Sequence, residues 1–501
     1  MTYTVTDLFA GAGGSSTGMV NTGLRVVIAA NHSELAVRTH QVNHPETDHD
    51  LADISQVDFR RYPKTDFLWA SPECTNHSIA KGKRRVTGQG DLFGTDEDDV
   101  AIRSRATMFD VPRALEAGVL RGRPYIGGVV ENVVDATEWM YWDSWIRMFD
   151  AAGYHVRPVF LNSMHARDDR AVPAPQSRDR LYVVFWLKKL GRSPNLNITL
   201  PAWCPRCETA VDAVQSWRRP DRMYGKHRQQ YDYACPNLRC RVVVEPAVRA
   251  AAEVIDWSEL GSRIGDRTRP LAAATIARIE AGLRKFARPM LAPAGGTWND
   301  GASPVDDPFR TRTTRETEGL ACPPMLIPTE SRAEPDRVAS AFGPMRTQTA
   351  RQDLALAVPA GFVMRNNTPR GGNEKAAGLC TPFNEPVRTI TTAGHQSVVT
   401  MPGQHLLMAY YGNGTCTPVT RPVPTQPTGE RFALVGGQVQ VEDCTFRMLQ
   451  PKEIAGAMAF PEGYILLGAK RDKVKLLGNA VTPPAAELLM RRLVDMVEAA
   501  A

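Results

Sequence analysis

The N-terminal run "YTVTDLFAGAGGSSTGMVNTG" constrains the fold of this chain most strongly. Apolar and polar residues alternate from Thr4 to Leu8, as in a β-strand, and a glycine-rich turn then leads into a helix. A strand, a glycine turn and a helix in this order commonly hold a nucleotide-like cofactor, because a ligand can approach a backbone without side chains. A glycine turn with a purely structural role is the alternative.

The next residues continue the alternation of strands and helices. A second strand over "LRVVIAANHS" ends at Asn31 and His32, and "LADIS" from Leu51 and "TDFLWASPEC" from Thr65 indicate a third and a fourth β element. Alternating β and α elements are typical of a sheet with parallel strands. We therefore predict an α/β fold for the N-terminal part of the chain.

Length and composition limit the class of protein. A chain of 501 residues exceeds one usual core, so we expect two or three domains. No secretory signal precedes the first strand, and the longest apolar run, "LYVVFWL" from Leu181, is too short to span a bilayer. We expect a cytoplasmic protein with reduced thiols and no membrane partner. A net charge of +6 favours a polyanionic partner only weakly.

Cys74 stands in the stretch "ASPECTNHSIAKG", directly after a predicted strand. Three interpretations are open from these residues alone: a nucleophile, a metal ligand together with His77, and a buried thiol. Its neighbours do not separate them.

Five motifs occur in a fixed order along the chain: "DLFAGAGG", "SPEC", "VVENVVD", "QSRDRLYVV" and "LLGNAVTPPAAELL". Together they resemble the motifs of the DNA cytosine-5 methyltransferases, over roughly Thr2 to Leu187 and Phe446 to Val497. The resemblance implies a Rossmann-like domain dependent on S-adenosylmethionine, in two parts, residues 1–195 and 441–501. It also implies double-stranded DNA as partner and a cytosine flipped out of the duplex. We expect a monomer. Metal ligation by Cys74 and His77 becomes the weaker interpretation.

The resemblance assigns catalytic roles to four residues. Cytosine C5 is a poor nucleophile until a thiolate adds to C6, so the reaction needs a cysteine, a group at N3, a methyl donor and a base. Cys74 is the expected thiolate, Glu131 the expected partner of N3, and Asn132 holds that segment. Arg178 is expected to contact the O2 atom of the base or the catalytic loop, and Arg180 is the expected structural or phosphate contact.

The resemblance also implies residues on the cofactor side and the DNA side. The expected cofactor residues are Phe9, Gly11, Gly13, Gly14, Asn31, Asp53, Pro72, Asn479 and Val481. Gln176 and Arg180 are expected on the DNA side.

The chain departs from the usual family pattern beside the nucleophile and at the second strand. Glu73 and Thr75 stand where the family has Pro and Gln, and Asn31 stands where it has an acid. Asn31 can still bond a ribose hydroxyl. A negative charge on Glu73 disfavours the thiolate unless a cation compensates, and we expect Lys81, Lys83, Arg84 or Arg85 to do so. After Cys74 we expect a loop that closes on DNA, with a plain insert as the alternative.

Four cysteines form a second signal, independent of the resemblance. They lie in "CPRC" and "CPNLRC", as Cys204, Cys207, Cys235 and Cys240. Paired cysteine loops of this kind turn four sulfurs toward one tetrahedral ion, so we predict a ribbon with structural Zn²⁺ over residues 200–245. Two hairpins with free thiols are the alternative. Basic and aromatic residues between the pairs suggest a surface for the DNA backbone.

A repeated motif forms the third signal. It reads "PFRTRTT", "PMRTQTA", "PVRTITT" and, more weakly, "PVPTQPT", beginning at Pro308, Pro344, Pro386 and Pro422. Each unit suggests a short β-hairpin, so we predict a β-rich target-recognition region over residues 246–440. Arg310, Arg346 and Arg388 are its candidates for contacts with phosphates or base edges. A repeated structural turn is the alternative.

These observations together predict a DNA cytosine-5 methyltransferase. Two alternatives share most of its features: an RNA cytosine-5 methyltransferase, and a DNA-binding relative without activity.

Overall fold

A computed structural model describes residues 2–73, 107–249, 251–254, 256, 262–270 and 450–499, together with the backbone of short strands between residues 290 and 448. The chain divides into two compact units. The first contains Met1–Ile255, Asn384–Gly394 and Gln450–Ala501, and the second contains Asp256–Phe383 and His395–Leu449.

A seven-stranded sheet with the order β3-β2-β1-β4-β5-β8-β6 forms the centre of the first unit. The strands are β1 (Thr4–Leu8), β2 (Arg25–Asn31), β3 (Asp48–Leu51), β4 (Phe67–Ala70), β5 (Gly127–Asn132), β6 (Tyr154–Asn162) and β8 (Asp179–Leu187). The first five run parallel to one another, and β8 lies antiparallel between β5 and β6. The predicted α/β class is therefore confirmed, with one reversed strand near the edge.

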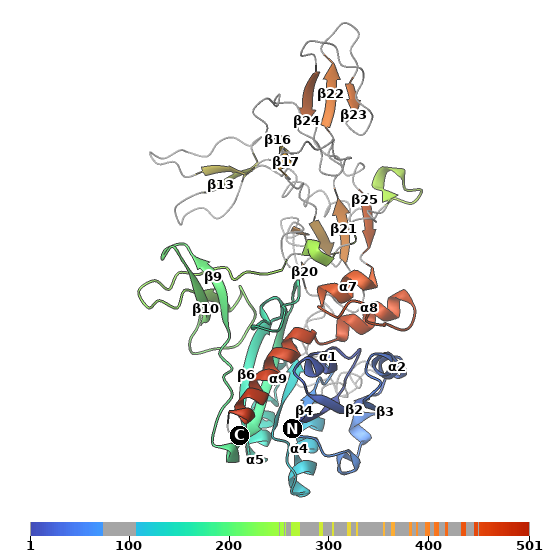
Figure 1. Cartoon of the computed structure of the whole chain (residues 1–501), viewed down its shortest axis with the longest axis vertical. Helices are drawn as coiled ribbons and strands as arrows, with labels where there is room; N and C mark the ends of the chain where they lie inside the picture. The colour runs from blue at the N-terminus through green and yellow to red at the C-terminus, as the bar shows by residue number, and fades with distance from the viewer. Residues whose placement is uncertain are drawn as a thin grey trace, which may run out of the picture. The chain divides into compact units, whose positions relative to one another are not determined.

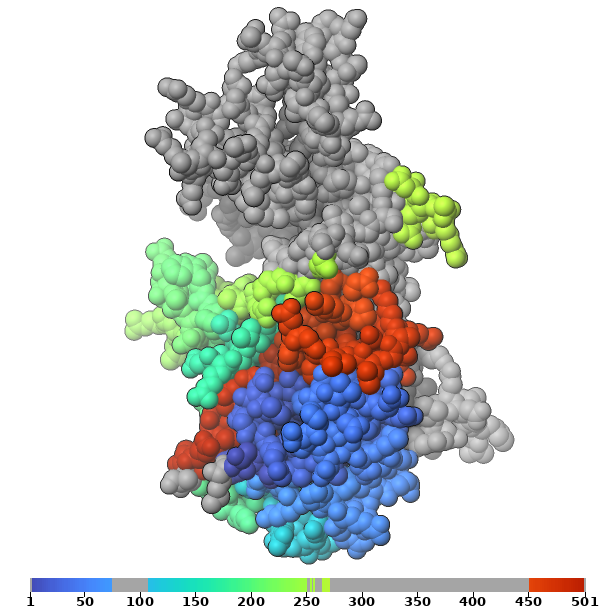
Figure 2. Space-filling view, turned by 45° about the vertical axis from the view of Figure 1, so that its right-hand side comes forward, coloured from blue at the N-terminus to red at the C-terminus, as the bar shows by residue number. Residues whose placement is uncertain are grey.

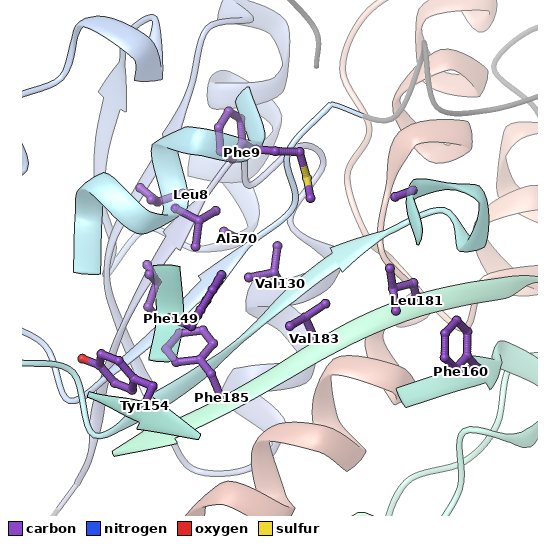
Figure 3. Packing of buried hydrophobic residues seen from close by; sticks show 14 of the residues in the cluster. Leu8, Phe9, Ala70, Val130, Phe149, Tyr154, Phe160, Leu181, Val183 and Phe185 are labelled. Atoms are coloured by element: carbon purple, nitrogen blue, oxygen red, sulfur yellow. The ribbon is translucent and has the colours of Figure 1, made fainter. Parts of the chain in front are cut away.

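Helices cover both faces of this sheet, and α7 and α8 pack on each other beyond its end (Figure 1). They are α1 (Gly14–Asn21), α2 (Glu34–Asn43), α4 (Asp110–Leu120), α5 (Trp142–Ala151), α7 (Pro451–Ala457), α8 (Lys470–Asn479) and α9 (Pro483–Glu498). Neighbouring strand residues point to opposite faces: Val130 packs with α4 and α5, whereas Val129 packs with α9. Figure 3 shows the first of these cores, in which Val130, Phe149 and Phe185 lie close together.

The two ends of the chain meet where α1 packs on α9. A Cβ atom on Gly14 would lie 2.0 Å from the Val481 carbonyl oxygen, and one on Gly18 would lie 2.3 Å from that of Pro483. Real Cβ atoms do not approach so closely, so these helix positions admit only glycine. The N-terminal and C-terminal residues consequently form one continuous surface (Figure 2).

The four-cysteine segment forms a three-stranded antiparallel sheet within the first unit. Its strands are β9 (Thr199–Cys204), β10 (Thr209–Trp217) and β11 (Tyr231–Ala234), in the order β11-β10-β9. We call residues 199–245 the ribbon. Leu200, Ala213 and Tyr231 belong to the same buried cluster as Phe160 and Leu181 of the central sheet. The ribbon therefore packs on the sheet and shares its core.

Short strands make up the described part of the second unit between residues 290 and 448. Together with β12, which precedes them in the chain, they form sheets with the orders β12-β25-β21-β18-β19, β14-β13-β15, β16-β17 and β23-β22-β24. The strands are β12 (Ser262–Arg263), β13 (Met290–Pro293), β14 (Ser303–Pro304), β15 (Glu318–Ala321), β16 (Ile327–Pro328), β17 (Leu354–Ala355), β18 (Phe362–Arg365), β19 (Cys380–Pro382), β21 (Gln396–Thr400), β22 (His405–Ala409), β23 (Cys416–Pro418), β24 (Phe432–Gly436) and β25 (Thr445–Met448).

One of the four repeated motifs falls partly on described residues. Within "PVRTITT", β20 (Val387–Arg388) pairs in parallel with β7 (Gln176–Ser177) of the first unit, and the rest of this motif lies outside the described residues. The other three motifs lie outside the described residues. Among the helices that the structure describes, none has the length and apolarity needed to cross a bilayer.

Candidate active site

The strand order reverses at β1, which has β2 on one side and β4 on the other. In open α/β sheets, ligands bind beyond the carboxyl ends of the strands at such a point. The loop after β1 and the loop after β4 meet here, because Ser71 N–H donates to the Leu8 carbonyl at 3.0 Å. The glycine-rich motif and the Pro-Glu-Cys motif are thus neighbours in the fold.

The loop after β1 is mostly buried and has one open position, Gly11. Phe9, Gly11 and Gly13 all have positive φ, at 61°, 54° and 91°. A Cβ atom on Gly11 would meet nothing closer than the Phe9 carbonyl oxygen at 3.9 Å. This open side fits the close approach of a cofactor. Gly14 differs, since Val481 fills the space above it. Cofactor contacts by Gly14 and Val481 stay predictions.

Asp7 lies fully buried beneath this loop and was not among the sequence candidates. Its Oδ2 accepts hydrogen bonds from Ser15 Oγ at 2.6 Å and Ser16 Oγ at 2.7 Å. Burial raises the pKa of Asp7 to about 7, although both serine bonds oppose this shift. The carboxylate holds the first turn of α1 against β1, and the adjacent pair Ser15-Ser16 was its only signal in the sequence.

The other predicted cofactor residues lie near the carboxyl ends of the strands. Asn31 ends β2 and its Oδ1 accepts from Ser33 N–H at 2.8 Å. Asp53 follows β3 and its Oδ1 accepts from Ser55 N–H at 3.0 Å. Asn479 ends α8 and is exposed. These local bonds fix the turns and leave the cofactor roles as predictions.

Glu131 and Arg180 form an ion pair at the carboxyl end of β5. Arg180 Nε lies 2.9 Å from Glu131 Oε1, and about a tenth of each side chain is exposed, 11% and 10%. The antiparallel register pairs Glu131 with Tyr182, so Arg180 lies diagonally across from the acid. We call these two residues the Glu131–Arg180 pair. A nearly buried acid beside a fixed cation can hold one edge of a planar polar ligand.

Arg178 contacts the C-terminal segment. Its Nη2 donates to the carbonyls of Gly478 at 3.1 Å and Ala480 at 3.0 Å, and the side chain is buried. Arg178 precedes β8, so strand alternation does not place it on the same side as Arg180. Arg178 therefore ties the C-terminal segment to the sheet, and Arg180 accompanies Glu131. The expected contact of Arg178 with the base O2 or the catalytic loop stays a prediction.

The Pro-Glu-Cys loop is described as far as Glu73. Asn132 Nδ2 donates to the Pro72 carbonyl at 3.3 Å, which connects the Glu-Asn-Val segment to this loop as expected for a holding role. Glu73 Oε1 lies 3.8 Å from His32 Nδ1, toward the end of β2. Cys74, Thr75, His77, Lys81, Lys83, Arg84 and Arg85 lie outside the described residues.

The four cysteines converge at one end of the ribbon. Their sulfur atoms all lie within 4.8 Å of one another. Cys204 Sγ is 3.6 Å from Cys240 Sγ, and Cys207 Sγ is 3.8 Å from Cys235 Sγ. Sulfur atoms at 2.3 Å from a tetrahedral zinc ion are separated by about 3.8 Å, so these distances fit Zn²⁺.

The predicted DNA-side residues divide between described and undescribed parts. Gln176 is buried and its backbone pairs with that of β20. Only the backbone of Arg388 is described, and Arg310 and Arg346 lie outside the described residues.

The mixed seven-stranded sheet, with a glycine loop at its switch point, defines the Rossmann-like methyltransferase class. The family model of the C-5 cytosine-specific DNA methylases matches residues 3–95 and 360–495. The chain is 35% identical over 89 residues to the Type II methyltransferase M.HgiGI of Herpetosiphon aurantiacus, covering 71% of that protein and 17% of this one. The chain therefore belongs to the C-5 cytosine-specific DNA methylase family.

Other relatives match shorter parts. Identity to the Type II methyltransferase M.Eco47II of Escherichia coli is 38% over 121 residues, 24% of this chain and 28% of the relative. Identity to M.HgiCII of Herpetosiphon aurantiacus is 28% over 194 residues, 37% of each chain. The match thus spans about a third of the length of these two relatives. The solved Entamoeba histolytica methyltransferase EhMeth is 10% identical, with a TM-score of 0.46 and 99% of each chain covered.

Proposed function

We propose that this chain transfers a methyl group from S-adenosylmethionine to C5 of a flipped cytosine in double-stranded DNA. The observation that carries the proposal is the Glu131–Arg180 pair, which lies at the end of β5 beside the Pro-Glu-Cys loop. Asn132 connects the two, so the acid and the guanidinium lie at the same end of the sheet as Pro72, two residues before the expected nucleophile Cys74 in the sequence.

The reaction follows from the chemistry of cytosine. The Cys74 thiolate adds to C6, and the electrons of the C5–C6 double bond move to C5, which then acts as the nucleophile. S-adenosylmethionine supplies the methyl group from its sulfonium sulfur. A base then removes the C5 proton, the double bond re-forms, and the C6–S bond breaks to release the cysteine.

The Glu131–Arg180 pair acts on the base. Glu131 protonates or hydrogen-bonds N3, which draws electrons from C6 and makes it more open to attack by the thiolate. Arg180 holds the carboxylate in place at 2.9 Å and offers its remaining N–H groups to O2. The open backbone at Gly11, together with Asn31 and Asp53, would hold the cofactor. Gln176, Arg310, Arg346 and Arg388 keep their proposed place on the DNA side.

We further propose that Cys204, Cys207, Cys235 and Cys240 hold a structural Zn²⁺ ion. All four ligands are sulfur, so no coordination position is left for a substrate. Mass spectrometric metal analysis of the purified chain should find one zinc ion per chain. Replacement of Cys207 by serine should lower that ratio, and absence of zinc from the wild-type chain would contradict the site.

Bisulfite sequencing of DNA from cells that express the chain tests the proposed reaction. We expect new 5-methylcytosine in one sequence context with the wild-type chain and none with Cys74→Ser, because serine is a far weaker nucleophile than a thiolate. Methylation that persists in Cys74→Ser would overturn the mechanism. Methyl transfer to tRNA but not to duplex DNA would instead favour the RNA enzyme, and no covalent trapping on 5-fluorocytosine DNA would favour an inactive relative.

Glu131→Gln tests the role of the acid separately. We expect methyl transfer to fall by about 100-fold, since glutamine cannot give a proton to N3. S-adenosylmethionine affinity, measured by calorimetry, should stay within about twofold, because Glu131 acts on the base. Equal losses in turnover and cofactor affinity would contradict this role.

A further inference from the structure

The ribbon contacts the active-site end of the sheet through two adjacent residues between β10 and β11. Lys226 Nζ lies 3.3 Å from Asp135 Oδ1 and 3.2 Å from Asp135 Oδ2. The backbone N–H of His227 donates to Asp179 Oδ1 at 3.0 Å. One short segment of the ribbon thus holds two different carboxylates, Asp179 at the start of β8 and Asp135 shortly after β5.

These two carboxylates stand next to the two members of the Glu131–Arg180 pair. Asp135 belongs to the 3₁₀-helix η5 (Val134–Glu138), which directly follows the end of β5 where Glu131 lies. Asp179 is the first residue of β8 and directly precedes Arg180. Lys226 and His227 therefore anchor the chain on both sides of the pair.

The surrounding seam is closely packed and partly buried. The His165 ring is buried and lies with its centroid 4.6 Å from that of His227 and 4.8 Å from that of Tyr233. Gln215 Nε2 also donates to the Phe160 carbonyl at 3.1 Å. Rings and hydrogen bonds on both sides of the ribbon limit its movement against the sheet.

Two of the four cysteines lie at the ends of ribbon strands. Cys204 ends β9, and Cys235 follows β11, the strand of Tyr231 and Tyr233. Arg228 N–H donates to the Tyr231 carbonyl at 2.8 Å, so β11 connects the cysteine end of the ribbon to the Lys226-His227 segment. An ion held by all four sulfurs would cross-link the three strands and fix this segment.

We propose that the ribbon is a positioning element for the base-binding side of the active site. Metal binding at the four cysteines orders the ribbon, and Lys226 and His227 then hold Asp135 and Asp179, which keeps Glu131 and Arg180 in register. Lys226 is a positioning residue in this proposal, since it acts on the Glu131–Arg180 pair only through its ion pair with Asp135. The catalytic consequence rests on the proposed function, whereas the ordering of the pair does not.

Small displacements of groups that act in a transition state have large effects. A shift of about 1 Å can cost up to about 100-fold in rate. The Lys226–Asp135 ion pair is partly screened, with 29% and 15% of the side chains exposed. Its loss should therefore have a smaller effect than loss of a catalytic group, of about tenfold in kcat.

Lys226→Met tests the proposal, with Lys188→Met as matched control. Lys188 Nζ also forms an ion pair, 2.7 Å from Asp150 Oδ1, but it lies in the 3₁₀-helix η7 (Lys188–Leu190) beyond the far end of β8. Both variants of the full chain should keep their thermal midpoint within a few degrees. Hydrogen–deuterium exchange of the segments 131–135 and 176–182 should rise several-fold in Lys226→Met only.

Kinetics then separate positioning from a general loss of structure. We expect Lys226→Met to lower kcat about tenfold with little change in the KM for S-adenosylmethionine, and Lys226→Arg to restore most of it. Removal of zinc by a chelator should raise exchange in the same two segments without a substitution.

The outcomes distinguish this proposal from the proposed function. Unchanged exchange of both segments in Lys226→Met and in the zinc-free chain would overturn the positioning role, whatever the activity. Raised exchange in a wild-type-like fold that methylates no cytosine would keep the positioning role and overturn the proposed function. Equal exchange in Lys226→Met and Lys188→Met would show a general effect of lost surface charge and would also overturn it.

Discussion

Two seams of the first unit join segments that are far apart in the sequence, and they use opposite kinds of contact. At the α1–α9 seam, Gly14 and Gly18 let one helix approach the backbone at Val481 and Pro483. At the ribbon seam, where the ribbon packs on the central sheet, side chains make the contacts. They are an ion pair from Lys226, a hydrogen bond to Asp179 and a group of packed rings. The first seam tolerates no added atom, whereas the second depends on charge and protonation.

This difference explains which seam a sequence motif reveals. A position that admits only glycine is visible in the sequence as a glycine, here next to the predicted cofactor loop. Lysine, aspartate and histidine occur on most protein surfaces, so Lys226 and Asp135 give no signal until the fold brings them together. The three predictions below test this contrast, from the largest expected effect to the smallest.

Gly18→Ala should destabilise the chain most. The new Cβ would lie 2.3 Å from the Pro483 carbonyl oxygen and 2.8 Å from Ala486 Cβ, so α1 or α9 must move, at about 3 kcal/mol. Gly118→Ala is the control, because Gly118 is also inside a helix and its Cβ would lie 3.3 Å from the nearest atom, the Arg123 carbonyl oxygen. Urea unfolding should place the control within about 1 kcal/mol of wild type. Similar losses of stability in both variants would show that the close packing of α1 on α9 does not set Gly18 apart from other helix glycines.

Arg178→Met should have the next largest effect. The Gly478 and Ala480 carbonyls would each lose a charged donor in a buried place, which costs about 2 to 3 kcal/mol. Arg218→Met removes an ion pair with Asp232 whose arginine side chain is half-exposed, and should cost at most about 1 kcal/mol. The free energy of unfolding of each variant checks this order. If Arg218→Met is the more damaging, Arg178 does not hold the C-terminal segment.

The ribbon seam should respond to acid. Burial, and then the nearby Arg228, lower the pKa of His227 from 6.5 to about 4. The contribution of neutral His227 to the free energy of unfolding is fully present above pH 6.5, where this side chain is neutral in both the folded and the unfolded chain. It is lost as the pH falls toward 4, because the unfolded chain binds the proton first.

The variant His227→Gln measures this contribution of His227 to the free energy of unfolding. We compare the free energy of unfolding of the wild type with that of the variant at pH 8 and at pH 5. The wild type should gain about 1 to 2 kcal/mol relative to the variant between pH 5 and pH 8. Comparing the two proteins at each pH cancels His40, His44 and His49, whose pKa values burial also lowers. The ring of His165 contacts His227, so the measured difference belongs to these two histidines together. A difference that does not change with pH would show that the ribbon seam is insensitive to protonation of His227.

Much of the candidate site could be predicted from short patterns. The strand and glycine turn after Thr4, the Glu-Asn-Val segment and the four cysteines each carry a local requirement that restricts the residue type. The assignment of Arg178 and Arg180 could not be made in this way. Two arginines two residues apart share a side only within a strand, and the sequence does not show that β8 begins between them at Asp179.

The sequence by itself determined the α/β class, the family and the convergence of four cysteine sulfurs, because strand period, glycine conformation and paired cysteine loops act over a few residues. Only the tertiary structure decided which arginine accompanies Glu131, that Asp7 lies buried beneath the cofactor loop, and that Lys226 and His227 hold the chain beside the Glu131–Arg180 pair. Those contacts join residues from different strands and turns, and their geometry depends on how β5, β8 and the ribbon pack together.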